Sequence, residues 1–268
     1  MPELPEVEVA RASVEPLVAG RRITSVDLHR PTVIRRVPSR QFAAGLVGKR
    51  VKRVRRRGKA LLFDLAPSWV LVFRFMLWGL LRVRSGATPA DPQTAVVLHF
   101  RGGMQLEFRE LQLSSLTLYR TREFSRDAFF ATMGIDPLAP AFDREYFAVL
   151  CKSRGTIRAV LTDQQRLAGI GNLWAHEVLH AARLRPSRSA ASLSESERTG
   201  LFHAIGRVLR RGIRSGGEPA FIDALGRRGR YRLAVYGCGG KRCPRGDGII
   251  RASRLGGRPS FYCPTCQR

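Results

Sequence analysis

The sequence is poor in acidic residues: 21 Asp and Glu stand against 47 Lys and Arg, which gives a formal net charge of +26 over 268 residues. A protein with this charge attracts polyanions, and nucleic acid is the first candidate. An anionic membrane surface would be the rival partner, but no basic amphipathic helix dominates the chain. A metal-dependent nuclease would need clustered carboxylates, and the sequence contains no such motif.

Long apolar runs are also missing. The longest run, residues 69–81, is interrupted by Arg74 and is shorter than the roughly 20 apolar residues that a spanning helix needs. The N-terminus is acidic and has no apolar signal core, so we expect a cytoplasmic protein that contacts no membrane. A hydrophobic content of 44% indicates a globular chain, and its length allows two domains with a sizeable core.

Cysteine is scarce, with five in the chain, yet four of them lie in the last 31 residues. Their spacing is Cys238-x4-Cys243-x19-Cys263-x2-Cys266. In a reducing compartment such clustering favours a metal site over disulfides. Four thiolates suit one structural, tetrahedral Zn²⁺, so the sequence predicts a zinc finger; free thiols or chance clustering are the alternative.

Hydrophobic patterning divides the chain into a β-rich first half and a helical second half. Residues 7–19 are predicted to form a helix. Short β-type runs separated by turn signals fill residues 22–120, which predicts an antiparallel sandwich or barrel. A linker follows near residues 134–138. Residues 143–215 have a helical pattern, in which Ser194 and Glu197 form a capping box.

The first six residues carry the strongest chemical signal. Removal of Met1 would leave Pro2 as a terminal secondary amine, and an α-amine has a pKa of about 8 against about 10.4 for lysine. Such an amine is a ready nucleophile for a carbonyl carbon and can form a Schiff base. Glu3 and Glu6 lie within one helical turn as candidate acid–base groups. The alternative is an ordinary acidic N-terminal helix.

Two further places could hold phosphate. Lys59 follows Gly58 at the start of a predicted strand, where it could serve catalysis or simply contact a phosphate. A glycine-rich turn, residues 168–172, ends in Asn172 between two helical segments, and such a turn either binds phosphate or is a plain interhelical connection. His176 and His180 share one helix face, but the sequence shows no third metal ligand beside them.

Together these features resemble the formamidopyrimidine-DNA glycosylase/endonuclease VIII family of base-excision repair enzymes, in its formamidopyrimidine branch. The resemblance covers essentially the whole chain. It is carried by the start Pro-Glu-Leu-Pro-Glu-Val-Glu at residues 2–8, by Gly58-Lys59, by Gly-Ile-Asp-Pro-Leu at residues 134–138, by Leu-Thr-Asp-Gln at 161–164, by Gly-Ile-Gly-Asn at 169–172 and by the cysteine-rich tail.

The resemblance implies an α+β multidomain fold: an N-terminal antiparallel β-sandwich with flanking helices, a helix–two-turn–helix domain and a C-terminal zinc-finger β-hairpin, with DNA between the lobes. We predict domains at residues 1–134 and 151–225, a linker at 135–150 and the finger at 226–268. The implied partner is damaged double-stranded DNA, bound by a monomer that associates with the bacterial nucleoid.

The resemblance also assigns roles. Pro2 would attack the sugar C1′ of a damaged nucleotide, Glu3 would move protons, and Lys59 would contact phosphate and assist β-elimination. Asn172 and Arg258 would clamp the phosphates, with Arg258 assisting δ-elimination. The supporting carboxylates would be Glu6 and Glu177, and further DNA contacts would come from Arg154, Met76 and Leu77.

The chain departs from the family pattern in its base-reading and metal-binding loops. The gap-filling methionine falls on Met76 or Leu77, and an Arg-Phe pair is replaced by Leu113-Ser114. The second zinc cysteine falls on Gly246. The stretch from residue 217 to 231 is short for a loop that caps an oxidised purine.

We therefore expect Cys238 to complete the zinc site by folding back from the preceding strand end; Asp247 is the alternative ligand. The predicted function is a bifunctional DNA glycosylase and abasic-site lyase that excises oxidised or ring-opened bases through a Pro2 Schiff base and cleaves the strand by β,δ-elimination. An abasic-site lyase or a non-catalytic damaged-DNA-binding zinc protein on the same scaffold are the alternatives.

Overall fold

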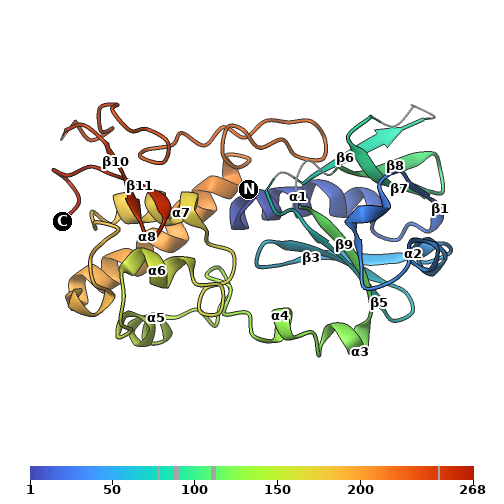
Figure 1. The fold of residues 1–268 in the computed structure, drawn as a ribbon, viewed down its shortest axis with the longest axis horizontal. Helices are drawn as coiled ribbons and strands as arrows, with labels where there is room; N and C mark the ends of the chain where they lie inside the picture. The colour runs from blue at the N-terminus through green and yellow to red at the C-terminus, as the bar shows by residue number, and fades with distance from the viewer. Residues whose placement is uncertain (78, 87–90, 110–112, 247) are drawn as a thin grey trace. The chain divides into compact units, whose positions relative to one another are not determined.

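The structure is a computed structural model that describes every residue except 78, 87–90, 110–112 and 247. The chain forms two compact units (Figure 1). The first comprises Met1–Thr132 together with Pro219–Gly229, and the second comprises Met133–Glu218 together with Arg230–Arg268.

Two sheets build the first unit. The five-stranded sheet has the order β2-β9-β5-β4-β3, antiparallel except where β2 runs parallel to β9, and the four-stranded sheet is antiparallel in the order β1-β7-β8-β6. The strands are β1 (Ile23–Leu28), β2 (Ile34–Arg35), β3 (Val51–Arg57), β4 (Ala60–Leu65), β5 (Trp69–Arg74), β6 (Leu80–Ser85), β7 (Thr94–Phe100), β8 (Met104–Arg109) and β9 (Ser115–Arg120).

Aromatic side chains join the two sheets face to face. Phe73 of β5 and Phe63 of β4 both meet Phe108 of β8, with ring centroids 5.1 and 5.9 Å apart and nearly perpendicular planes. Edge-to-face pairs of this kind stabilise a core beyond the area they bury. The predicted antiparallel sandwich is therefore confirmed, because side chains of one face of each sheet share a single core.

Helix α1 (Leu4–Val18) packs on β3 and β4 and buries Leu4, Val7 and Val14. It begins three residues before the predicted helix because Pro5 fits the first turn and Glu3 caps it. The other helical segments of this unit are 3₁₀ turn η1 (Pro31–Val33), α2 (Ser39–Leu46), α3 (Thr121–Phe124) and α4 (Ala128–Ala131).

The second unit contains helices and a terminal hairpin. Helix α7 packs against α6, α8 and strand β11, so it is central to this unit. The capping box predicted at Ser194 and Glu197 begins α8. The elements are α5 (Arg144–Cys151), α6 (Ile157–Thr162), α7 (Asn172–Ala181), 3₁₀ turn η2 (Ala190–Ser192), α8 (Glu195–Arg214), β10 (Arg251–Leu255) and β11 (Arg258–Tyr262).

The α+β fold class agrees with the prediction. The predicted division into three domains and a linker has more parts than the two compact units of the structure. The four-part division remains a prediction. Residues 219–229 belong with the first unit, because the backbone N–H of Val83 donates to the carbonyl of Ala224, and the predicted linker 135–150 contains most of α5. Of the helices that the structure describes, none is long and apolar enough to cross a membrane.

Two glycines of α8 make a matched stability test. A Cβ at Gly212 would lie 2.4 Å from the Trp174 ring of α7, whereas a Cβ at Gly200 would meet nothing within 4 Å. Gly212→Ala should therefore lower the unfolding free energy by about 1–3 kcal/mol through overpacking. Gly200→Ala should raise it by about 0.5–1 kcal/mol through helix propensity. Urea unfolding of both variants measures the difference, and equal stabilities would contradict close packing of α7 on α8.

Candidate functional site

The chain start is held by reciprocal hydrogen bonds. The backbone N–H of Glu3 donates to the Glu6 carboxylate at 3.0 Å, and the Glu3 carboxylate accepts from the backbone N–H of Glu6. Both side chains are almost fully buried, and Pro2 is buried before them, while Met1 is 48% exposed. The predicted acid–base carboxylate is thus fixed one residue from the predicted nucleophile, at the positive end of α1.

Lys59 lies at the tip of the β3–β4 hairpin. Arg57 pairs with Ala60, so Gly58 and Lys59 form a two-residue turn, and Gly58 has the positive φ (57°) that such turns require. Helix α1 is tied to this hairpin because Arg56 of β3 donates to Glu8 of α1 at 3.1 Å. The structure therefore places the N-terminal turn and Lys59 on elements that pack together in the first unit.

Arg158 of α6 organises the predicted phosphate-contacting residues of the second unit. Its guanidinium donates to the Asn172 side-chain oxygen at 3.0 Å and to the Leu255 carbonyl at 2.7 Å. The Asn172 amide in turn donates to the Pro259 carbonyl at 2.9 Å. Burial, and then the neighbouring charge of Arg258, lower the pKa of Arg158. Asn172 and Arg258 are thereby brought into one cluster.

Sequence reasoning missed Arg158, although a signal exists. It stands in the apolar run Ile157-Arg158-Ala-Val-Leu and is 5% exposed. A charged residue on a buried helix face usually has a specific partner. Here the partners are two groups more than a dozen residues away in the chain, which no sequence pattern displays.

His176 completes the link between α7 and the hairpin. Its Nδ1 donates to the Asn172 carbonyl at 2.5 Å, and its Nε2 accepts from the Ser260 hydroxyl at 3.1 Å. Burial lowers the pKa of His176 to about 4, so the ring is neutral at physiological pH and the described hydrogen bonds persist.

Glu177, predicted as a supporting carboxylate, contacts the backbone of the segment that leads into the finger. Its carboxylate accepts the backbone N–H groups of Ala234, Val235 and Tyr236 at 2.9–3.0 Å. Burial raises the pKa of Glu177, and these three donors act in the opposite direction. The described contacts make Glu177 the anchor of the chain entering the finger.

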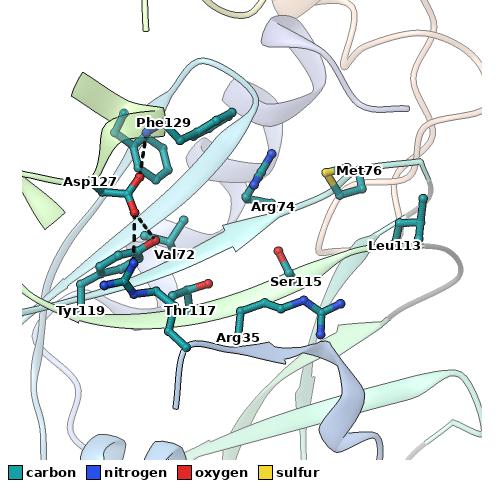
Figure 2. A pocket seen from close by; sticks show the side chains of 12 residues that line it. Arg35, Val72, Arg74, Met76, Leu113, Ser115, Thr117, Tyr119, Asp127 and Phe129 are labelled. Atoms are coloured by element: carbon teal, nitrogen blue, oxygen red, sulfur yellow. Dashed lines mark hydrogen bonds and ion pairs between the residues drawn. The ribbon is translucent and has the colours of Figure 1, made fainter. Parts of the chain in front are cut away.

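The predicted base-reading residues lie on two loops of the first unit. Leu113 is 63% exposed and Leu77 is 39% exposed, while Met76 is half-buried and Ser114 is buried. Met76 and Leu113 line the same cavity (Figure 2). Arg154, a predicted DNA contact of the second unit, is exposed in the turn between α5 and α6.

Four side chains gather at the finger. The ligand atoms of His180, Cys243 and Cys266 lie within 4.8 Å of one another, with His180 Nε2 3.4 Å from Cys243 Sγ and the two sulfurs 3.9 Å apart. Cys263 is fully buried in the same cluster as Cys243 and Cys266. Burial, and then these neighbouring thiols, raise the pKa of Cys266 to about 12.

This donor set fits zinc. A tetrahedral ion with bonds of about 2.0–2.3 Å separates its ligand atoms by roughly 3.3–3.8 Å, close to the observed distances. Three thiolates and an imidazole are a ligand set found in structural zinc sites. His180, Cys243, Cys263 and Cys266 therefore form the structural zinc site, and a bound ion contributes directly to folding of the finger.

The prediction of Cys238 as the fourth ligand is wrong in this structure. The Cys238 thiol points to the carbonyls of Tyr236 (3.6 Å) and Leu233 (4.0 Å) and is absent from the cluster. His180 takes the place that Gly246 leaves open, because α7 packs against β11 and delivers the imidazole to the finger. Asp247, the alternative ligand, lies outside the described residues.

Comparisons with known proteins agree with this geometry. Family models described as the formamidopyrimidine-DNA glycosylase N-terminal domain and H2TH domain match residues 1–113 and 133–221. Formamidopyrimidine-DNA glycosylases of Pelotomaculum thermopropionicum and Desulforamulus reducens are 36% and 38% identical, each over 100% of this chain and 99% of the relative.

Solved structures of Lactococcus lactis Fpg are also similar. A complex with DNA containing an abasic site has a TM-score of 0.91 at 28% identity, covering 99% of both chains. A complex with DNA containing N7-benzyl-Fapy-dG has a TM-score of 0.92 at 29% identity, covering 100% of both chains.

The sandwich, the capped Pro2-Glu3 start and the finger with its zinc-binding residues define a class of protein: a DNA glycosylase with abasic-site lyase activity. Within that class, the chain belongs to the formamidopyrimidine-DNA glycosylase family. The family resemblance found in the sequence is confirmed.

Removing the Arg158 guanidinium should loosen the hairpin from α7. Arg158→Met keeps most of the apolar stem but leaves Asn172 and the Leu255 carbonyl without their donor, which should cost about 1–3 kcal/mol of stability. Thermal unfolding followed by circular dichroism measures this loss. Arg166→Met, at a half-exposed ion pair with Asp163, is the control and should change stability by less than about 1 kcal/mol.

The zinc assignment is tested by two single substitutions. His180→Ala should lower bound zinc far below one ion per chain and decrease the melting temperature, because a ligand is lost. Cys238→Ser should keep wild-type zinc content. Elemental analysis after dialysis against a chelator gives the readout. Loss of zinc in Cys238→Ser, with full zinc content in His180→Ala, would show that Cys238 and not His180 is the fourth ligand.

Proposed function

We propose that this protein removes oxidised and ring-opened purine bases from double-stranded DNA and cleaves the resulting abasic site, acting as a monomer. The observation that carries the proposal is the buried, doubly hydrogen-bonded Glu3 that follows Pro2 at the start of α1. A carboxylate held in this way can exchange protons with a substrate attacked by the neighbouring amine.

The chemistry follows from the terminal amine. After removal of Met1, the Pro2 nitrogen forms a bond to C1′ of the damaged nucleotide, while the C1′–base bond breaks and the base leaves with a proton. The C1′–O4′ bond of this aminal then breaks, with O4′ taking up a proton, and leaves an iminium at C1′. The iminium acidifies the C2′ proton, whose removal expels the 3′ phosphate in β-elimination. Glu3 carries protons in these steps, and Glu6 orients the backbone of Glu3 through its hydrogen bond.

Each unit brings its own phosphate-contacting residues. Lys59 would serve in the first unit from the tip of its hairpin, supported by the strand pairing on both sides. Asn172, Arg258 and Arg154 would serve in the second, where the N-terminus of α7 adds favourable N–H groups. The net charge of +26 supplies the general attraction for DNA.

Selection of the base opposite the lesion should be weak. An arginine that reads a partner base contributes about 1–3 kcal/mol of discrimination. Leu113 offers an exposed apolar side chain and Ser114 is buried, so neither can make that contact from its observed position. Met76 and Leu77 remain the candidates for filling the gap left by the flipped nucleotide.

The place of action follows from the substrate. Chromosomal DNA is in the bacterial cytoplasm, and the organisms of the similar proteins are bacteria. We therefore place the protein at the nucleoid. A lyase without glycosylase activity, and a binding protein without catalysis, are the rival functions that the next experiment separates.

Borohydride trapping on DNA tests the function. The wild-type protein should cross-link to duplexes containing an abasic site or a ring-opened purine, and the linked peptide should begin at Pro2. Glu3→Gln should slow base excision by about 10²–10⁴-fold while retaining DNA binding, since it removes proton transfer and nearly keeps shape.

The rivals give different results. A lyase alone would be trapped on abasic DNA but would not excise the ring-opened base. A binding protein would give no trapped complex on either duplex. Cross-linking through Lys59 would show that Pro2 is not the nucleophile.

A further inference from the structure

The first unit contains a cavity of about 440 Å³ beside strand β9 (Figure 2). Its lining includes Arg35, Arg74, Thr117, Tyr119, Asp127 and Phe129. The volume lies within the roughly 300–1,000 Å³ typical of small-molecule pockets. None of the catalytic roles proposed above uses this cavity.

Strand register explains why the cavity exists. Thr117 of β9 lies opposite both Val72 of β5 and Arg35 of β2, and Ser115 lies opposite Arg74. These side chains therefore share the sheet face that points away from the sandwich core, while Leu116 and other alternate residues enter the core. Small hydroxyl side chains at the centre of this face leave room above the sheet.

The cavity is cationic. Three arginines line it, against one carboxylate, Asp127. Asp127 accepts from the Tyr119 hydroxyl at 3.0 Å and from the Phe129 backbone N–H at 3.1 Å, and it lies 3.6 Å from Arg36. Among the residues with described positions, no carboxylate forms an ion pair with Arg35 or Arg74. The Arg35 guanidinium donates to the backbone carbonyls of Thr32 and Ile34, which leave its charge unneutralised, so the charges of Arg35 and Arg74 can attract an anionic ligand.

Flat groups line the same space. The Arg74 guanidinium lies 4.1 Å from the centroid of the Phe129 ring, and the Arg36 guanidinium lies 5.0 Å from that of Tyr119. Guanidinium planes and aromatic rings are the surfaces on which proteins stack unpaired bases. The hydroxyls of Ser115 and Thr117 and the Asp127 carboxylate add groups that can hydrogen-bond to a base edge.

Backbone strain is concentrated around this cavity. Arg36, Met76 and Leu113 have φ angles of 74°, 48° and 57°, and they are three of the four non-glycine residues with positive φ in the described chain. Such conformations cost about 1–3 kcal/mol each and tend to persist at functional sites. Leu113, 63% exposed, could act as an apolar wedge that unstacks a base.

We propose that this cavity binds one unstacked nucleotide of the bound DNA, with its base against Arg74 and Phe129 and its phosphate beside Arg35. The inference rests on the proposed function, because it requires a DNA substrate. A free phosphate would need less space and no stacking surfaces. The nucleotide could come from the position opposite the lesion or from a neighbouring position, and the first experiment distinguishes these sources.

Photo-crosslinking locates the nucleotide. 5-Iodouracil is placed in turn at each position of both strands of a duplex that contains a non-cleavable abasic-site analogue. We expect one position to cross-link to Tyr119 or Phe129, and that position identifies the strand. Cross-links confined to other parts of the protein, at every position tested, would overturn the proposal.

A plug in the cavity floor provides the second test. Thr117→Phe fills the space without changing charge, and Thr117→Val keeps its shape. Thr117→Phe should abolish the Tyr119 or Phe129 cross-link and weaken binding of the abasic duplex about 5- to 150-fold, the equivalent of one stacked base. Thr117→Val should retain the cross-link and weaken binding far less than Thr117→Phe, because it removes one hydroxyl but leaves the space open. A folded Thr117→Phe variant with unchanged cross-link and affinity would refute the pocket.

Two measurements distinguish an incorrect pocket assignment from an incorrect proposed function. Borohydride trapping of wild-type protein on abasic DNA reports the function alone. If trapping succeeds while Thr117→Phe has no effect, the pocket assignment is wrong and the function stands. If trapping fails, the function itself is wrong.

Discussion

Burial of two carboxylates at the start of α1 is the constraint on which the geometry of the N-terminal turn depends. Glu3 and Glu6 are each at most 3% exposed, and each accepts a backbone N–H from the other's residue. Unpaired carboxylates at this depth would be costly, so the capping box and the positive helix end are what permit them. The packing of α1 on β3 and β4 then fixes this turn relative to Lys59.

In the second unit, a buried cation and a metal site connect elements that are distant in the chain. Arg158 joins α6, Asn172 and the β10–β11 hairpin through two hydrogen bonds, and the zinc site joins α7 to the finger through His180. Both links converge on α7, which also carries Asn172 at its first turn. Because the finger has few apolar residues of its own, its order depends on these polar and metal links.

Much of the fold could be predicted because its signals are local. The strand pattern between residues 22 and 120, the capping box of α8 and the glycine turn before Asn172 all depend on neighbours within a few residues. The roles of Arg158 and His180 could not be predicted from local patterns, because their partners lie 14 to 97 residues away in the chain. The cysteine spacing favoured Cys238 as the fourth zinc ligand, because the spacing takes account only of residues in the same stretch of chain.

The sequence by itself determined the family, the Pro2-Glu3 start, three of the zinc ligands and the DNA-attracting charge, because each is a matter of residue type and short spacing. Only the tertiary structure decided the fourth zinc ligand, the role of Arg158 and the cavity over Thr117. Helix packing and strand register bring residues together that are distant in the chain. A local sequence pattern predicts neither the contacts between these residues nor the cavity that they enclose.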